Sequence, residues 1–253
     1  MNEDAGTAPR DAARPPPPRI DPAVHALFLD FDGTFVDFAP TPEAIKLRLG
    51  SRELLERLSR RLNGALAIVS GRRIADLDRF LAPLELPASG VHGQEFRPGP
   101  GDFRNQPPTP DLDVARRRLS ATLAPEDGLL IEDKGGALVL HYRVNPEKRG
   151  RAKALAYNAA SGLDDVVVVE GHFIFELRQR AVTKAVALKL FADVPAFRKR
   201  CPIFVGDDTT DEDGLAEAER VGGFGVKVGP GSTNARYRLD DVSAVHAWLA
   251  NLI

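Results

Sequence analysis

Short apolar runs alternate with amphipathic stretches along most of the chain. Residues 25–30 (HALFLD) and 65–69 (ALAIV) are largely apolar runs of strand length; the first ends in Asp30 with Gly33 shortly after it, and Ser70 and Gly71 follow the second. Residues 42–62 place their apolar side chains at near-helical spacing, and residues 73–81 predict a shorter helix. Strand, helix, strand, helix in this order is typical of a parallel α/β sheet with right-handed crossovers.

The pattern changes after Pro98 and returns near residue 182. Segment 98–111 holds five prolines and two glycines, which is typical of a linker or long loop. A helix–strand–strand–helix–strand–strand unit follows: helix 111–124, strands 129–134 and 137–143 around Gly135-Gly136, a helix that Asn145 caps and Pro146 begins, and strands 166–170 and 173–178. The parallel pattern then resumes with helix 182–192, strand 202–205, acidic loop 206–213, helix 214–220, strand 224–228 and a final helix near 242–252.

These patterns predict two structured parts and a leader. Residues 1–20 hold five of the 20 prolines and few apolar residues, so we expect a disordered leader without the apolar segment of a signal peptide. Residues 21–105 and 181–253 are expected to form one Rossmann-like α/β core. Residues 106–180 are expected to form a smaller α+β domain inserted into that core.

Composition narrows the class of protein. The 253 residues carry a net charge of −2, whereas proteins that bind nucleic acid or anionic membranes generally have a basic excess. The one cysteine, Cys201, cannot form an internal disulfide, and no apolar run approaches the roughly 18 residues of a membrane span. We therefore expect a cytoplasmic monomer that acts on a small molecule, without nucleic-acid or membrane partners.

Two candidate catalytic segments follow predicted strands. Asp30 and Asp32 stand two residues apart before Gly33, so one carboxylate could act as a nucleophile and the other as an acid and base. A simple Asp-Gly turn is the alternative interpretation. Ser70 follows the second strand and could donate a hydrogen bond to a phosphate, or it could cap the next helix.

Two further segments carry charge. Lys184 lies at the beginning of a predicted helix, where a cation opposes the helix dipole, so it either neutralises a bound anion or is a solvated surface lysine. Segment 206–213 (GDDTTDED) has five acidic residues in eight, which favours Mg²⁺ binding over the alternative of an acidic helix N-terminus. An EF-hand is excluded because the loop lacks its glycine and its closing glutamate.

In this order, the four segments resemble the motifs of the haloacid dehalogenase-like phosphohydrolase superfamily. Further segments resemble, more narrowly, the trehalose-6-phosphate phosphatase family: SGR at 70–72, HGQE at 92–95, IEDKGGALVLHYR at 131–143, FELR at 175–178, GDDTTDED at 206–213 and YRLDDVSAVHAWL at 237–249. The resemblance implies that the inserted domain is a cap over the active site of the core.

The resemblance also implies a role for each catalytic residue. Asp30 attacks phosphorus and becomes an aspartyl-phosphate, and Asp32 protonates the leaving sugar oxygen and then activates water. Ser70 and Lys184 hold the phosphoryl oxygens. Mg²⁺ is bound by the Asp30 carboxylate, the Asp32 carbonyl and Asp207, with Asp208 in support.

The substrate is then trehalose 6-phosphate, and core and cap residues bind it. The positions implied are Gly33, Thr34, Gly71, Arg72, His92, Glu132, Lys134, Arg143 and Glu176, with Glu95 as a further candidate. For Arg143 and His141, ordinary surface charge on a hairpin strand is the alternative.

Three other functions stay open from the sequence. The same chemistry could act on another sugar phosphate, such as sucrose 6-phosphate or a glycosyl-3-phosphoglycerate. A phosphoacceptor domain of the receiver type also uses an aspartate, a lysine and Mg²⁺, although Asp32 and the predicted cap argue against it. The third alternative is a non-catalytic regulatory module.

Overall fold

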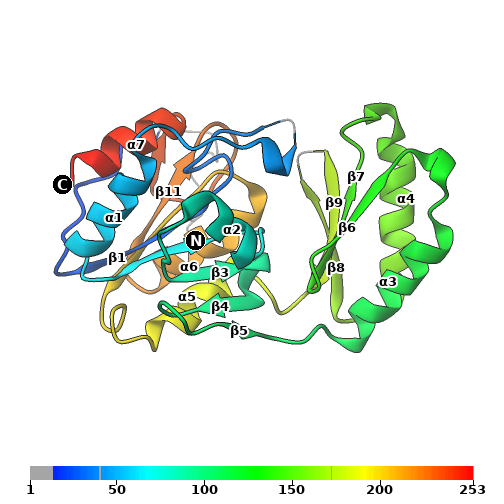
Figure 1. Ribbon diagram of the computed structural model, residues 1–253, viewed down its shortest axis with the longest axis horizontal. Helices are drawn as coiled ribbons and strands as arrows, with labels where there is room; N and C mark the ends of the chain where they lie inside the picture. Colours follow the sequence, from blue (N-terminus) through cyan, green and yellow to red (C-terminus); the bar gives the residue numbers. More distant parts are fainter. Residues whose placement is uncertain (1–13, 40, 172, 253) are drawn as a thin grey trace, which may run out of the picture.

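Two separate β-sheets organise residues 14–39, 41–171 and 173–252, which are the residues that the computed structural model describes (Figure 1). The larger sheet has eight strands in the order β12-β11-β10-β1-β2-β3-β4-β5, and the smaller has four in the order β6-β7-β9-β8. All strands of the smaller sheet come from the sequence between β5 and β10. The smaller sheet is therefore part of an insertion in the chain that forms the larger one.

The larger sheet is parallel from β12 to β3, and β4 and β5 are antiparallel. Its strands are β1 (His25–Leu29), β2 (Leu66–Val69), β3 (Ala88–Gly90), β4 (Glu95–Arg97), β5 (Arg104–Asn105), β10 (Cys201–Gly206), β11 (Phe224–Val228) and β12 (Tyr237–Leu239). The predicted parallel α/β core is confirmed. Strands β3, β4, β5 and β12 were not predicted because two or three residues are too few to form a recognisable pattern.

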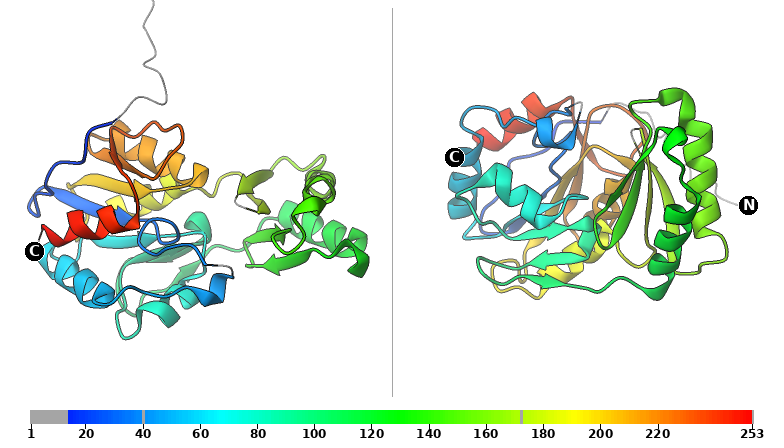
Figure 2. Two further views of the ribbon diagram at one scale, coloured as in Figure 1. Left: turned by 90° about the horizontal axis from the view of Figure 1, so that it is seen from above. Right: turned by 45° about the vertical axis from the view of Figure 1, so that its right-hand side comes forward.

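Helices cover both faces of this sheet. They are α1 (Ser51–Arg61), α2 (Ile74–Leu81), α5 (Lys184–Ala192), α6 (Glu212–Arg220) and α7 (Val242–Ala250). Helices α1, α2 and α7 lie on one face and α5 and α6 on the other (Figure 2). Because both faces are covered, every residue of β2 is buried, which explains its uninterrupted apolar run.

The predicted helix over residues 42–62 is wrong for its first half. Only Pro42–Ala44 forms a single 3₁₀ turn, and α1 begins at Ser51. Gly50 precedes it with a φ of 79°, a left-handed conformation that does not continue a right-handed helix and that favours glycine.

The insert, Pro110–Gln179, is a second α/β layer. It comprises α3 (Pro110–Thr122), β6 (Leu130–Asp133), β7 (Ala137–His141), α4 (Arg149–Ala160), β8 (Val166–Gly171) and β9 (Ile174–Gln179). One face of its sheet packs on α3 and α4 through its own apolar cluster, which includes Leu112, Leu138 and Phe175. Its other face is turned toward the core (Figure 1).

The predicted start of the second insert helix needs correction. Pro146–Lys148 forms a 3₁₀ turn before α4, and the Asn145 side chain makes no capping bond. Asn145 Nδ2 instead donates a hydrogen bond to the Gly128 carbonyl, 2.7 Å away. A tertiary partner thus replaces the local cap.

The proline-rich leader is attached to the core in its second half. Residues 1–13 lie outside the described residues. The Pro15 carbonyl accepts a hydrogen bond from the backbone of Arg238 on β12, the Pro18 carbonyl accepts one from Trp248 Nε1, and Ile20 is buried. The expected disorder is therefore wrong for residues 14–20, because a proline run retains free carbonyl acceptors that an edge strand and an indole can use.

Among the described residues, no helix combines the length and the apolar character needed to span a bilayer.

Candidate active site

Asp30, Ser70 and Asp207 come after neighbouring parallel strands. Strand β1 lies between β10 and β2, so the end of β1, which carries Asp30, is flanked by the ends that carry Asp207 and Ser70. Ligands of such sheets bind beyond the carboxyl ends of the strands. The topology thus brings together at one edge three segments that are far apart in the sequence.

Lys184 is a buried cation at this edge. Its Nζ donates hydrogen bonds to Asp30 Oδ1 at 2.6 Å and to Asp211 Oδ1 at 2.5 Å. Only 2% of Lys184 is exposed, so it is not the solvated surface lysine of the alternative interpretation. The unfavourable placement at the first residue of α5 is offset by two carboxylates.

Asp207 is held by its neighbours from several directions. Thr34 Oγ1 donates to Asp207 Oδ1 at 3.1 Å. A Cβ added at Gly33, whose φ is 78°, would lie 2.3 Å from Asp207 Oδ2, so the close approach of the two loops requires glycine. The backbone N–H groups of Asp207 and Asp208 both donate to Asp211 Oδ2, at 3.1 and 2.9 Å.

The carboxylates of this edge repel one another. Burial, followed by the charge of Asp211, raises the pKa of Asp30 well above its usual value, although Lys184 acts in the opposite direction. Burial and Asp211 likewise raise the pKa of Asp207 to about 7. Burial opposes the charge of Lys184, but Asp211 and Asp30 outweigh it and raise the pKa of that lysine. Negative charge is therefore in excess at this edge, which we call the carboxylate edge after Asp30, Asp207 and Asp211.

This cluster fits a divalent cation. Asp30, Asp207 and Asp211 each place one carboxylate oxygen within 4.8 Å of the others. In the part of the chain that the structure describes, Oδ2 of Asp30 and Oδ2 of Asp207 accept no hydrogen bond from the protein, whereas both oxygens of Asp211 are bonded. Mg²⁺ sites in proteins typically contain a small number of carboxylate oxygen ligands.

The structure places Asp211, and not Asp208, in this cluster. Asp208 Oδ1 accepts a hydrogen bond from the backbone of Thr209 at 2.6 Å and caps the 3₁₀ turn Thr209–Asp211. Its supporting role toward the metal stays a prediction. The run of five acids indicated the loop correctly, but sequence spacing could not tell which carboxylates point inward.

Asp32 is paired with Arg72. The guanidinium donates two parallel hydrogen bonds, from Nε to Oδ2 at 2.6 Å and from Nη2 to Oδ1 at 2.8 Å. The Arg72 guanidinium carbon also lies 5.2 Å from the ring centre of Phe80 and 5.9 Å from that of Phe31. The carboxylate predicted to act as acid and base therefore has a fixed orientation.

Ser70 does not cap α2. It is buried, and its Oγ accepts a hydrogen bond from the backbone of Arg72 at 3.1 Å. The backbone of Ile74, the first residue of α2, donates instead to Glu95 Oε2 at 2.6 Å. Glu95 is thus a helix-capping residue from β4, and burial raises its pKa.

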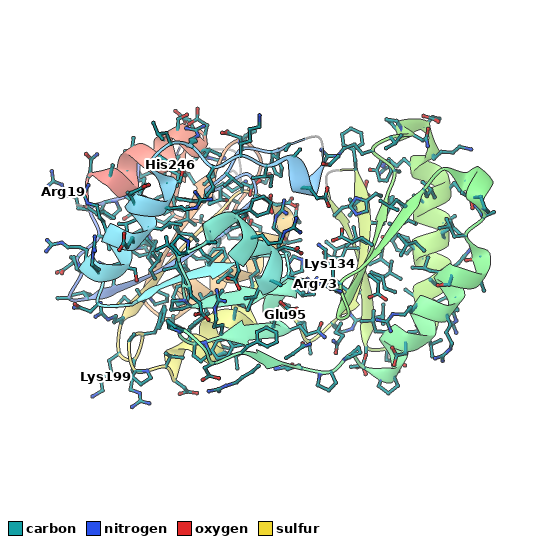
Figure 3. The ribbon with its side chains drawn as sticks, in the orientation of Figure 1. Arg19, Arg73, Glu95, Lys134, Lys199 and His246 are labelled. Carbon is teal, nitrogen blue, oxygen red and sulfur yellow. The ribbon has the colours of Figure 1, made fainter. Side chains whose placement is uncertain are left out.

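Predicted sugar-binding residues from the insert contact the core. Lys134 Nζ donates to the Gly71 carbonyl at 3.0 Å, and His92 Nε2 lies 3.0 Å from Glu176 Oε2. Figure 3 labels Arg73, Glu95 and Lys134, which lie where the two parts meet. Burial disfavours the Glu176 charge, but His92, Lys134 and Arg178 outweigh it and lower the pKa of Glu176 to about 2.

The two remaining predicted insert residues, Glu132 and Arg143, also have hydrogen-bond partners. Glu132 Oε2 lies 2.9 Å from His141 Nε2, and this hydrogen bond, opposed by burial, lowers the pKa of Glu132. Arg143 donates to the Ala39 carbonyl of the core at 2.9 Å. These contacts show that His141 and Arg143 are not free surface charges.

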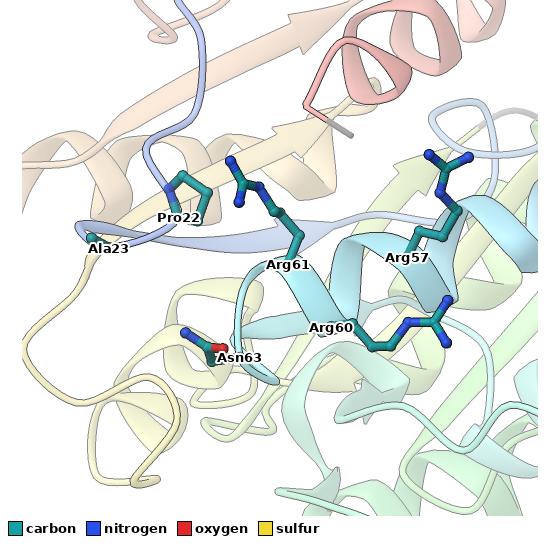
Figure 4. A pocket seen from close by; sticks show the side chains of 6 residues that line it. All are labelled: Pro22, Ala23, Arg57, Arg60, Arg61 and Asn63. Carbon is teal, nitrogen blue, oxygen red and sulfur yellow. The ribbon is translucent and has the colours of Figure 1, made fainter.

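A cavity of about 610 Å³ lies elsewhere, between the segment that precedes β1 and the end of α1 (Figure 4). Exposed side chains, including those of Arg57, Arg60 and Arg61, line it. None of the predicted catalytic residues is among them, so the active-site assignment remains with the carboxylate edge.

Comparison with known proteins shows the family to which this chain belongs. Residues 28–243 match the family model of trehalose-phosphatase. The chain is 34% identical over 229 residues to trehalose-6-phosphate phosphatase of Escherichia coli, covering 90% of this chain and 86% of that protein. It is 36% identical over 209 residues to a probable trehalose-phosphate phosphatase of Sinorhizobium fredii, covering 81% and 78%.

Solved structures agree in fold. A trehalose-6-phosphate phosphatase related protein superposes with a TM-score of 0.69 at 27% identity, over 90% of this chain and 96% of that one. A haloacid dehalogenase-like hydrolase of Bacillus subtilis gives a TM-score of 0.66 at 14% identity, over 90% and 99%, which shows the fold alone. With the family model spanning most of its length, this chain belongs to the trehalose-phosphatase family and is a phosphatase with the haloacid dehalogenase-like fold.

Proposed function

We propose that this phosphatase hydrolyses trehalose 6-phosphate to trehalose and inorganic phosphate, with Mg²⁺ and through an aspartyl-phosphate on Asp30. The observation that carries the proposal is the buried contact of Lys184 with Asp30, next to Asp207, at the edge where three parallel strands end. An anionic nucleophile that approaches an anionic phosphate needs positive charge to offset their repulsion, and Lys184 supplies it from the protein.

The first step transfers the phosphoryl group to the protein. A carboxylate oxygen of Asp30 attacks phosphorus, and the bond between phosphorus and the sugar oxygen breaks. Asp32 gives its proton to that leaving oxygen, so trehalose departs neutral. The bidentate pair with Arg72 orients Asp32, and each of its oxygens keeps a further lone pair for the proton.

The second step regenerates the enzyme. Asp32, now ionised, takes a proton from water, and the water oxygen attacks phosphorus. The bond between phosphorus and Asp30 breaks, and phosphate leaves. Ser70 and Lys184 hold phosphoryl oxygens in both steps, which keeps the reacting group in line with its nucleophile.

Bound Mg²⁺ would offset the charge of the phosphate and of Asp30. Asp30, Asp207 and the backbone carbonyl of Asp32 would hold it, with Asp208 in support. Asp211 acts differently, because Lys184 and two backbone N–H groups already use its oxygens. It supports the lysine and the Asp207 loop.

The substrate assignment rests on the family match and on the insert. Glu132, Lys134 and Glu176 offer carboxylates and an ammonium to sugar hydroxyls close to Gly71 and Arg72, which follow Ser70 in the loop after β2. A substrate panel tests it, with phosphate release measured from trehalose 6-phosphate, sucrose 6-phosphate and a glycosyl-3-phosphoglycerate at saturating Mg²⁺. We expect trehalose 6-phosphate to have the highest kcat/KM. A higher value for another sugar phosphate would overturn the substrate and leave the two-step chemistry in place.

A further inference from the structure

Lys227 is a second buried lysine beside the carboxylate edge, and the two-step chemistry does not use it. It lies on β11 opposite Gly206 of β10, the residue immediately before Asp207. Only 4% of it is exposed. Burying an ammonium group costs free energy unless its protons are bonded, so an apolar side chain of similar length would be the cheaper occupant.

The ammonium of Lys227 bonds to backbone carbonyls rather than to carboxylates. Its Nζ donates to the Asp207 carbonyl and, at 2.9 Å, to the Val228 carbonyl. The first of these partners belongs to a residue of the candidate metal site. The second lies on the strand of Lys227 itself and fixes the ammonium in place.

The peptide group between Asp207 and Asp208 is held at both ends. Lys227 binds its carbonyl oxygen, and Asp211 Oδ2 accepts from its N–H at 2.9 Å. A cation thus meets the negative end of the peptide dipole and an anion meets the positive end. A shift of this peptide would carry the Cα of Asp207 with it, and the carboxylate would move relative to Asp30.

We propose that Lys227 is a positioning residue that sets the Mg²⁺ affinity of the site by fixing the Asp207–Asp208 peptide. The inference rests on the proposed function, because it assumes that Asp30 and Asp207 bind Mg²⁺. Charge alone predicts the opposite effect: a cation near the site repels Mg²⁺, so its removal would tighten binding. The sign of the change therefore separates positioning from simple electrostatics.

The test is calorimetric titration of MgCl₂ into the metal-free full chain without substrate. The variants are Lys227→Met, which removes both donors and the charge, Lys227→Gln, which is neutral and shorter, and Lys227→Arg, which keeps the charge and donors. Lys153→Met, at an exposed position on α4 of the insert, is the control. Far-UV circular dichroism confirms that each variant is folded.

We expect Lys227→Met to weaken Mg²⁺ binding by about 10-fold or more, as removal of a supporting group behind a metal ligand does. Lys227→Gln should weaken it as well, Lys227→Arg should remain closer to the wild type, and Lys153→Met should match it. If Lys227→Met does not fold, Lys227→Gln decides.

Three results would overturn the inference. Unchanged or tighter Mg²⁺ binding by the folded Met or Gln variant, with normal binding by the wild type, would remove the role of Lys227 and leave the proposed function intact. A wild-type chain that binds no Mg²⁺ would remove both. Lower thermal stability with unchanged Mg²⁺ affinity would show a purely structural lysine.

Discussion

The guanidinium of Arg72 binds both carboxylate oxygens of Asp32, at 2.6 and 2.8 Å, and so connects the segment after β2 to the proposed acid and base. Two parallel bonds define the plane of the carboxylate as well as its position. A single-point donor cannot do this. The pair therefore gives a direct test of orientation.

Arg72→Lys keeps the charge and loses the bidentate geometry. We expect kcat to fall by about 10-fold or more, because Asp32 then meets the leaving oxygen in several orientations. Steady-state kinetics on trehalose 6-phosphate measure it. Arg73→Lys is the matched control, since the Arg73 side chain donates to the Asp133 carbonyl in the insert and, among the described residues, makes no hydrogen bond to Asp32. Equal kcat in the wild type and in Arg72→Lys would show that Arg72 does not orient Asp32.

Lys184→Met should destabilise the fold as well as abolish activity. It leaves Asp30 and Asp211 buried without their shared cation, and breaking a buried pair in this way costs about 3–5 kcal/mol. Urea unfolding in metal-free buffer gives the free energy of unfolding. Lys189→Met, at an exposed position on the same helix, should change it by less than about 0.5 kcal/mol. Similar values for the two variants would contradict the account.

Gly136 is where the insert meets Gln94 of the core. A Cβ added at Gly136 would lie 0.8 Å from Gln94 Oε1, and Gln94 is buried and donates from Nε2 to the Gln106 carbonyl at 2.7 Å. We therefore expect Gly136→Ala to displace the insert and lower kcat/KM by about 10-fold or more.

Gly150→Ala is the control for that substitution, because its added Cβ would meet no atom within 4 Å beyond its chain neighbours and the nearby backbone of its own helix. The double variant Gln94→Ala/Gly136→Ala should recover part of the lost kcat/KM, since the overlapping side chain is gone. Failure of the double variant to recover would argue against steric overlap as the cause.

Glu176 gives the protein a pH-dependent stability. Its pKa is lowered from 4.5 to about 2, so its ionised carboxylate stabilises the fold above pH 4.5, and this stabilisation is lost as the pH falls from 4.5 toward 2. The free energy of unfolding of the wild type should therefore decrease more over this range than that of Glu176→Gln. Urea unfolding across the range measures both, and parallel decreases would refute the assigned contact with His92.

The positions of the proposed catalytic aspartates could be predicted because each follows a strand that is recognisable from its apolar run. Asp30 follows β1, and Asp207 follows β10, both of which are buried parallel strands. Lys184 was also predictable, since its position at the start of a helix is unfavourable without an anionic partner. Because β1 and β10 are neighbouring parallel strands, their carboxyl ends, which carry Asp30 and Asp207, lie side by side.

Other contacts depend on tertiary structure and leave no local pattern. Asp211 and Asp208 are equally acidic in sequence, and only the path of the 3₁₀ turn directs the first to Lys184 and the second to Thr209. Glu95 caps α2 from a strand of three residues. The proline run is bound to the core because β12, too short to be predicted, offers an open edge N–H.

The most direct test of the central claim is phosphate release from trehalose 6-phosphate by the wild type and by Asp30→Asn, with Mg²⁺ and with EDTA. The account predicts rapid phosphate release by the wild type with Mg²⁺. EDTA should abolish this release, and added Mg²⁺ should restore it. The rate of release by Asp30→Asn should be lower than that of the wild type by about 10³-fold or more. Release by Asp30→Asn at the wild-type rate, or release that EDTA leaves unchanged, would contradict it.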